Sequence, residues 1–141
     1  MRFWDSSAIL PLLVLEQQSD YCVESFSQDG NVLVWTLAKI EVFSALCRRL
    51  RDRSLRQESF DMAVNRMHDL FETVYEIVGI PRVKDRALRL LRVHPLRAAD
   101  SLQLAAALVA TEENTSRFPI MCFDERLTTA ARLEGFEVNP K

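Results

Sequence analysis

The chain has 141 residues, of which 48% are hydrophobic and 27% are charged, and these shares are typical of a globular domain rather than a disordered or fibrous protein. Its formal net charge of -2 gives no overall attraction to polyanions, so any binding of nucleic acid must depend on a local basic patch or a bound metal ion. No apolar run approaches the roughly 20 residues that span a bilayer, and the start lacks the basic region of a signal peptide, so we expect a cytoplasmic protein with no membrane contact.

Short apolar runs and longer runs with helical spacing alternate along the chain. The short runs are rich in Val, Ile, Phe, Trp or Tyr and predict strands, and the longer runs predict helices. In chain order we expect strand 2–4, helices 7–15 and 20–27, strand 31–36, helices 37–53 and 57–73, strand 75–78, helices 82–91 and 98–111, strand 119–123, helix 125–134 and strand 136–138. This alternation predicts an α/β protein, a three-layer α/β/α arrangement with a mostly parallel sheet of about five strands. No repeat or linker interrupts it, which predicts a single domain over residues 1–141.

The segment 37–73 is predicted to form two consecutive helices that are broken near Ser54. Apolar residues recur there at helical spacing: Phe43, Leu46, Leu50, Phe60, Ala63, Val64, Met67 and Leu70. Packing inside the monomer is one use of such a stripe. A projecting pair of helices that receives an amphipathic helix from a partner is another, and the sequence leaves both interpretations open.

The nitrogen and sulfur side chains argue against several kinds of site. Cys22, Cys47 and Cys122 have no CxxC spacing, which disfavours a disulfide framework and structural zinc and favours buried apolar roles. His68 and His94 are isolated, so the sequence supports neither a zinc site nor a Ser–His hydrolase.

Four acidic residues stand where α/β proteins collect ligands. Asp5 and Asp124 end predicted strands, whereas Glu41 and Asp100 lie about one turn into predicted helices. Ligands of parallel sheets bind outside the carboxyl ends of the strands, near a switch in strand order, so the four side chains can converge. Charged groups beside apolar runs are costly without a counter-charge, which predicts a bound cation.

Each acid also has a structural interpretation. Asp5 and Asp124 could cap the helices that follow them, and Asp100 could be an ordinary acidic residue of a first turn. Glu41 lies in a mainly apolar stretch away from any predicted cap, where pairing with an arginine or reaching solvent are the alternatives. Taken together the four favour a metal site, and Glu125 is a reserve candidate for an extra ligand.

A cluster of three or four carboxylates is suited to Mg²⁺ or Mn²⁺. These hard cations prefer oxygen ligands, and such a cluster can hold one or two ions while leaving positions for water and a phosphate oxygen. The cation offsets repulsion between the acids, binds an anionic diester and lowers the pKa of an attacking water. The four acids therefore predict metal-dependent hydrolysis of phosphodiesters.

Four short stretches carry these acids: FWDSSA at 3–8, IEVFSAL at 40–46, LRAADSLQLA at 96–105 and CFDERL at 122–127. In this order and spacing they resemble the motifs of PIN-domain ribonucleases, of the VapC type found as toxins of VapBC toxin–antitoxin systems. The resemblance covers nearly the whole chain.

The resemblance implies that Asp5, Glu41, Asp100 and Asp124 are the catalytic, metal-binding acids. It further implies that the Ser7 hydroxyl supports the first acid or a water on the metal. Cys122 departs from the pattern, because Ser or Thr is common two residues before the last acid. A thiol is a weaker hydrogen-bond donor, so we expect altered support for Asp124.

The resemblance also implies an activity and partners. Members are Mg²⁺- or Mn²⁺-dependent endoribonucleases that cut single-stranded or structured RNA, usually as homodimers. A small antitoxin silences them, with a C-terminal segment that wraps the toxin and often places a basic residue in the site. The helices at 37–73 would then form a clamp for the dimer or the antitoxin.

Two basic clusters are candidates for an RNA-backbone path. They are Arg48, Arg49, Arg51, Arg53 and Arg56, and then Arg82, Lys84, Arg86, Arg89, Arg92 and Arg97. Ordinary charged helix faces are the alternative. Arg97, three residues before Asp100, is the best candidate for a phosphate contact or for pairing an acid, whereas Trp4 and Trp35 lie in strand patterns and are expected in the core.

Two other functions compete with the nuclease. A haloacid-dehalogenase-like phosphatase also uses a strand-ending Asp and Mg²⁺, but it needs a second Asp where Ser7 stands and a supporting Lys that we cannot place. A non-catalytic PIN-like module that binds RNA or protein is the main alternative.

Overall fold

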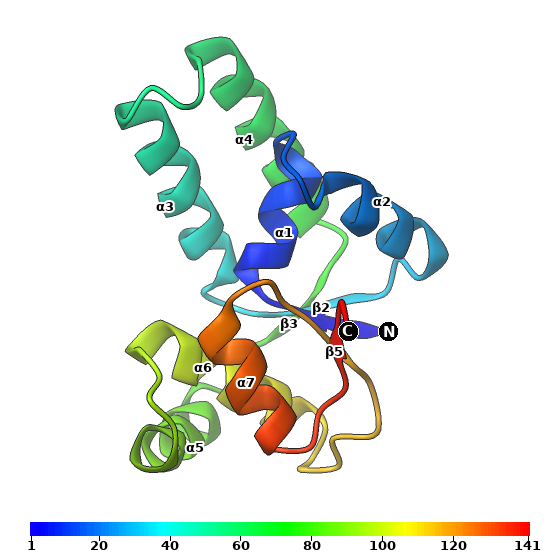
Figure 1. Ribbon diagram of the computed structural model, residues 1–141, viewed down its shortest axis with the longest axis vertical. Helices are drawn as coiled ribbons and strands as arrows, with labels where there is room; N and C mark the ends of the chain where they lie inside the picture. The colour runs from blue at the N-terminus through cyan, green and yellow to red at the C-terminus, as the bar shows by residue number, and fades with distance from the viewer.

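The computed structural model describes residues 1–141 as a five-stranded parallel sheet between two layers of helices (Figure 1). The strands are β1 (Arg2–Trp4), β2 (Val32–Trp35), β3 (Tyr75–Ile77), β4 (Ile120–Met121) and β5 (Val138–Asn139), and the helices are α1 (Ser6–Leu13), α2 (Ser19–Gln28), α3 (Ala38–Arg51), α4 (Gln57–Phe71), α5 (Ile80–Val93), α6 (Ala98–Ala110) and α7 (Glu125–Leu133). The predicted α/β/α fold with a parallel sheet of five strands is confirmed.

The boundary of the last strand differs from the prediction. Strand 136–138 was expected, but β5 covers Val138–Asn139. Gly135 has a φ of 96° and ends α7, and the N–H of Phe136 then donates to the Ala131 carbonyl at 3.0 Å. This left-handed helix end uses Phe136 to close the last turn, so the residue packs into the core without joining the sheet.

The strand order is β3-β2-β1-β4-β5, with every neighbouring pair parallel. The chain builds outward from β1 through β2 to β3, and then returns to the other side of β1 with β4 and β5. The switch in strand order therefore lies between β1 and β4. Ligands of such sheets bind at the carboxyl ends of the strands beside this switch.

Alternating side chains of the strands divide the core between the two helical layers. Trp4, Val34 and Met121 pack in one cluster with residues of α1 to α4, and Phe3 and Trp35 pack in the other cluster with residues of α5 to α7. Figure 1 shows these two groups of helices on opposite faces of the sheet. Both tryptophans are fully buried, so their predicted core roles are confirmed.

The cysteines follow the predicted apolar role only in part. Cys22 and Cys122 are buried, but Cys47 is only partly buried. All three are free thiols, as expected.

The paired helices α3 and α4 extend away from the rest of the domain (Figure 1). Their inner faces join the core shared with α1, through Val42, Leu46, Ala63, Met67 and Phe71. Of the predicted stripe, Leu46, Ala63 and Met67 are buried inside the monomer. Not all of it is covered: the outer face includes Ile40, which is 65% exposed, and Phe43, which is 41% exposed and lies beside Phe60.

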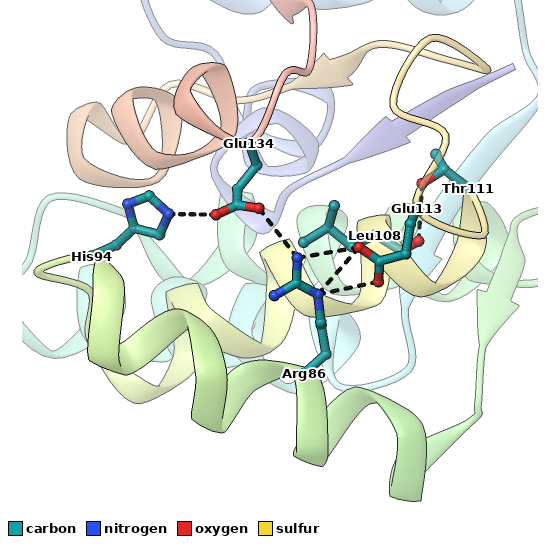
Figure 2. Close-up of polar contacts among 6 residues, drawn as sticks. All are labelled: Arg86, His94, Leu108, Thr111, Glu113 and Glu134. Carbon is teal, nitrogen blue, oxygen red and sulfur yellow. Dashed lines mark hydrogen bonds and ion pairs between the residues drawn. The ribbon is translucent and has the colours of Figure 1, made fainter.

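Arg86 belongs to an ion-pair network and not to a free basic surface (Figure 2). Its guanidinium donates to Glu113 at 3.1 Å and to Glu134 at 3.2 Å, and Glu134 also contacts the ring of buried His94 at 2.7 Å. The network joins α5 to the end of α7 and to the turn after α6. Arg86 therefore does not belong to the predicted RNA path, because its guanidinium already pairs with both acids.

None of the seven helices combines the length and the apolar character that a membrane span requires.

Candidate active site

Asp5 and Asp124 follow β1 and β4 at the switch point, and each caps the next helix. The Ser7 N–H donates to Asp5 Oδ2 at 2.9 Å, and the Leu127 N–H donates to Asp124 Oδ1 at 2.8 Å. The capping interpretation is therefore correct for both, but it does not compete with a role in the site. Each cap fixes one carboxylate oxygen, and the other oxygen accepts no hydrogen bond from the protein.

Glu41 lies in the first turn of α3, which begins at Ala38, so it is about one turn into the helix as predicted. Its Oε2 accepts hydrogen bonds from Ser6 Oγ and from Gln103 Nε2, each at 3.0 Å. No arginine pairs with it. Neutral donors from α1 and α6 hold this acid, and neither donor was singled out from the sequence.

Asp100 lies in the first turn of α6, and its Oδ2 accepts from the backbone N–H of Arg97 at 3.3 Å. The Arg97 guanidinium forms no ion pair, so the expected pairing with an acid occurs through the backbone only. The side chain of Arg97 is exposed beside the acids.

All four acids line one open cavity of about 540 Å³ at the carboxyl end of the sheet. Ser7 and Arg97 also line it, together with Arg48 from the first basic cluster. Residues that are up to 119 positions apart in sequence thus meet at one place, as the topology requires. Every predicted site residue lies at this cavity.

A smaller pocket of about 280 Å³ shares the walls formed by Asp100 and Asp124. Its other residues are Arg97, Glu125 and Arg126. Glu125, the reserve candidate, therefore lies beside the main cavity but does not line it. Arg126 was not considered from the sequence, although it directly follows the last acidic motif.

The acids repel one another in a partly desolvated site. Burial raises the pKa of Asp5, and the nearby charge of Asp124 raises it further, while hydrogen bonds from Ser7 and Ser6 lower it in part. Burial also raises the pKa of Glu41, with smaller increases from the charges of Asp5 and Asp100. These shifts mean that the protein by itself disfavours the fully ionised site.

The pKa of Asp100 is also raised, but here basic residues oppose the rise. Burial raises its pKa, the backbone hydrogen bond from Arg97 lowers it, and the charge of Asp124 raises it. The more distant charges of Arg97 and Arg126 lower the pKa slightly. No Lys, Arg or His side chain lies within ion-pair distance of any of the four acids, so none of them has a direct basic partner.

The chemistry of this donor set fits a hard divalent cation, because carboxylate oxygens surround the cavity and no imidazole or thiolate lines it. In the observed side-chain arrangement, however, no three acidic, histidine or cysteine side chains lie close enough together to hold a metal ion. The structure therefore shows a carboxylate cavity without a preformed metal centre.

Ser7 and Cys122 lie behind Asp5. The Ser7 hydroxyl accepts from the Phe123 N–H at 3.0 Å and lies 3.8 Å from Cys122 Sγ, while the Ser7 backbone N–H donates to Asp5. The Cys122 thiol lies 3.8 Å from Asp5 Oδ2 and 3.6 Å from the backbone carbonyl oxygen of Asp124. The altered support for Asp124 stays a prediction, and the side-chain contacts of the thiol are with Asp5 and Ser7. Burial raises the pKa of the Cys122 thiol, which keeps it protonated.

Comparison with known proteins gives relatives over almost the full chain, although no family model matches. Ribonuclease VapC45 and Ribonuclease VapC49, from two strains of Mycobacterium tuberculosis, are each 28% identical to it over 138 residues, which is 98% of this chain and 94% of theirs. The crystal structure of FitAcB from Neisseria gonorrhoeae superposes with a TM-score of 0.67 and 13% identity, covering 98% of this chain and 96% of that one. A structure of FitAB bound to an IR36 DNA fragment also superposes with a TM-score of 0.67 and has 15% identity, covering 98% of this chain and 93% of that one. The chain is thus similar over almost its whole length to the VapC ribonucleases, and it shares the fold of the FitAcB structure.

Proposed function

We propose that the chain is a Mg²⁺- or Mn²⁺-dependent endoribonuclease that hydrolyses RNA phosphodiester bonds, and that it acts as the toxin of a toxin–antitoxin pair. The observation that carries this proposal is the single cavity lined by Asp5, Glu41, Asp100 and Asp124, none of which pairs with a basic side chain. The 28% identity to proteins named ribonucleases supports RNA as the substrate class.

The four carboxylates would hold one or two divalent ions. When bound, such ions supply positive charge to a phosphate and lower the pKa of an attacking water. The protein contributes rigid placement of the acids: backbone N–H groups fix one oxygen of Asp5 and of Asp124, and side-chain donors fix one oxygen of Glu41. Acids that are held before the substrate arrives cost less reorganisation during the reaction.

Three exposed arginines are suited to hold the RNA backbone near the acids. Arg48 and Arg97 line the main cavity, and Arg126 lines the adjoining pocket, and none of them is engaged in an ion pair. Arg49 is different, because it pairs with Glu16 at 2.6 Å. Only part of the two predicted basic clusters therefore supports a phosphate path.

The α3–α4 pair offers a place for the antitoxin. A groove of about 230 Å³ between these helices is lined by Lys39, Ile40, Phe43, Met67 and His68. An amphipathic antitoxin helix can bury its apolar face there.

A homodimer would use a second apolar surface. The exposed Leu88, Leu91 and Val93 of α5 are candidates for this surface. Sedimentation of the isolated toxin measures whether two copies associate.

The test is cleavage of end-labelled RNA by purified, antitoxin-free protein in Mg²⁺, Mn²⁺ or EDTA. Asp5→Asn and Asp100→Asn serve as the paired inactive variants. We expect discrete cuts that need the metal and disappear in both variants. Folded protein that cuts none of tRNA, rRNA and mRNA with either metal would instead favour the non-catalytic binding module.

The phosphatase alternative finds no support at the cavity. None of its 14 lining residues is a lysine, and Ser7 occupies the place where that family needs its second Asp. Hydrolysis of a small phosphate monoester, measured beside the RNA assay, would reopen this alternative.

A further inference from the structure

Gln103 is a fully buried polar side chain in the apolar helix α6. It is 1% exposed and lies in α6 among Leu104, Ala105, Ala106 and Ala107, all of which are also buried. A polar group in such surroundings needs a specific partner, since burial without hydrogen bonds disfavours folding.

Its partner is one oxygen of Glu41. Gln103 Nε2 donates to Glu41 Oε2 at 3.0 Å, and Ser6 Oγ donates to the same oxygen at 3.0 Å. The Oε1 atom of Glu41 accepts no hydrogen bond from the protein. Donors from two other helices thus fix one side of this carboxylate and leave the other side free at the cavity that Glu41 lines.

The amide orientation of Gln103 follows from this contact. If the amide were turned over, its carbonyl oxygen would face a carboxylate oxygen at about the same distance, and two acceptors would repel each other. In the observed orientation the Gln103 Oε1 atom is buried and has no partner. A buried acceptor without a partner lowers stability, whereas an apolar side chain of similar length would avoid this cost. Stability alone therefore does not explain a glutamine at this position.

We propose that Gln103 is a positioning residue which, together with Ser6, holds Glu41 so that one carboxylate oxygen is free to bind the divalent ion. This inference rests on the proposed metal-dependent function. The role of the two hydrogen bonds that Glu41 accepts is then to place the carboxylate for the ion, and not to hold the helices together.

The test compares Gln103→Met with Thr111→Val. Methionine has a similar length and no polar hydrogen, and Thr111 is a matched control because it is a fully buried polar residue at the end of the same helix. Binding of Mn²⁺ is measured by calorimetry, and the melting temperature is measured in EDTA. We expect Gln103→Met to weaken Mn²⁺ binding about tenfold, as is typical when a residue that orients a ligand is lost, and to melt within about 3 °C of the wild type. Thr111→Val should bind Mn²⁺ like the wild type.

A second readout needs no metal. The side-chain amide resonances of Gln103 should shift in Glu41→Gln and stay unchanged in Glu58→Gln, which alters an exposed acid of α4. Resonances that do not respond to Glu41→Gln would remove the contact on which the proposal rests.

Other results overturn the proposal directly. If Gln103→Met binds Mn²⁺ as tightly as the wild type, or if Thr111→Val weakens binding equally, the role of Gln103 in placing Glu41 is refuted while RNA cleavage by the wild type stands. If the wild type neither binds Mn²⁺ nor cuts RNA, the proposed function fails and this inference fails with it.

Discussion

Replacing Asp5 by asparagine should stabilise the metal-free protein. Asparagine keeps a carbonyl oxygen that can accept the Ser7 N–H and cap α1, but it removes a buried negative charge beside Asp124. Burial raises the pKa of Asp5 in the folded state above its ordinary value of 3.8. The folded protein therefore favours the protonated acid, and stability is lost as the pH rises through the raised pKa.

The size of the gain follows from the linkage between pKa and stability. Each unit by which folding raises a pKa costs about 1.4 kcal/mol of unfolding free energy once the pH is above that pKa. For a chain of 141 residues the entropy of unfolding is about 0.3 kcal/mol per degree, so each kcal/mol corresponds to about 3 °C. We expect Asp5→Asn to melt higher than the wild type at pH 7.5 in EDTA, by about 3 °C for each kcal/mol gained.

Thermal unfolding from pH 4 to pH 8 measures this effect. The gain of Asp5→Asn should be largest at neutral pH and should shrink toward pH 4, because the wild-type acid is protonated in both states only below its ordinary pKa of 3.8. In millimolar Mg²⁺ the order should reverse, because the cation stabilises only the site that binds it. Glu58→Gln, on the exposed surface of α4, is the control for loss of a charge alone. An Asp5→Asn variant that melts lower than the wild type at pH 7.5 in EDTA would refute the argument that the acids repel one another.

Three further predictions test the fold and the substrate path. Gly135→Ala should lower the unfolding free energy in urea by about 1 to 2 kcal/mol, because φ is 96° and the new Cβ would lie 3.1 Å from Thr115 Oγ1. Leu104→Ala should cost about 2 to 5 kcal/mol in the same assay, since Leu104 is fully buried. Arg97→Gln should remove about one phosphate contact and so reduce the slope of log K against log salt concentration for RNA binding in EDTA. Arg89→Gln, at an exposed position of α5, should leave that slope unchanged.

The strand-ending acids could be placed from the sequence because their surroundings are local. Asp5 and Asp124 each follow an apolar strand and begin a helix, and a parallel sheet brings such positions together whatever the details of packing. Each cap uses one carboxylate oxygen and leaves the other without a protein partner, so capping is compatible with a proposed role in ligand binding.

The supports of Glu41 could not be predicted in this way. Its hydrogen bonds come from Ser6, 35 positions away, and from Gln103, 62 positions away, and they depend on how three helices pack. A glutamine within an apolar helix is only a weak sign of a buried polar contact, because a glutamine on the solvent-facing side of such a helix would look the same in the sequence. Arg86 was misassigned for the same reason: its partners Glu113 and Glu134 become neighbours only through the packing of α5 and α7.

The most direct test of the account is the single-turnover rate of RNA cleavage in Mn²⁺ for a matched set of acid-to-amide variants. The set is Asp5→Asn, Glu41→Gln, Asp100→Asn and Asp124→Asn, with Glu125→Gln as the control from the adjoining pocket. We predict that each of the four loses at least about a hundredfold in rate and that Glu125→Gln stays within a few-fold of the wild type. Near-wild-type rates in any two of the four variants, measured on folded protein, would contradict a site that depends on all four acids.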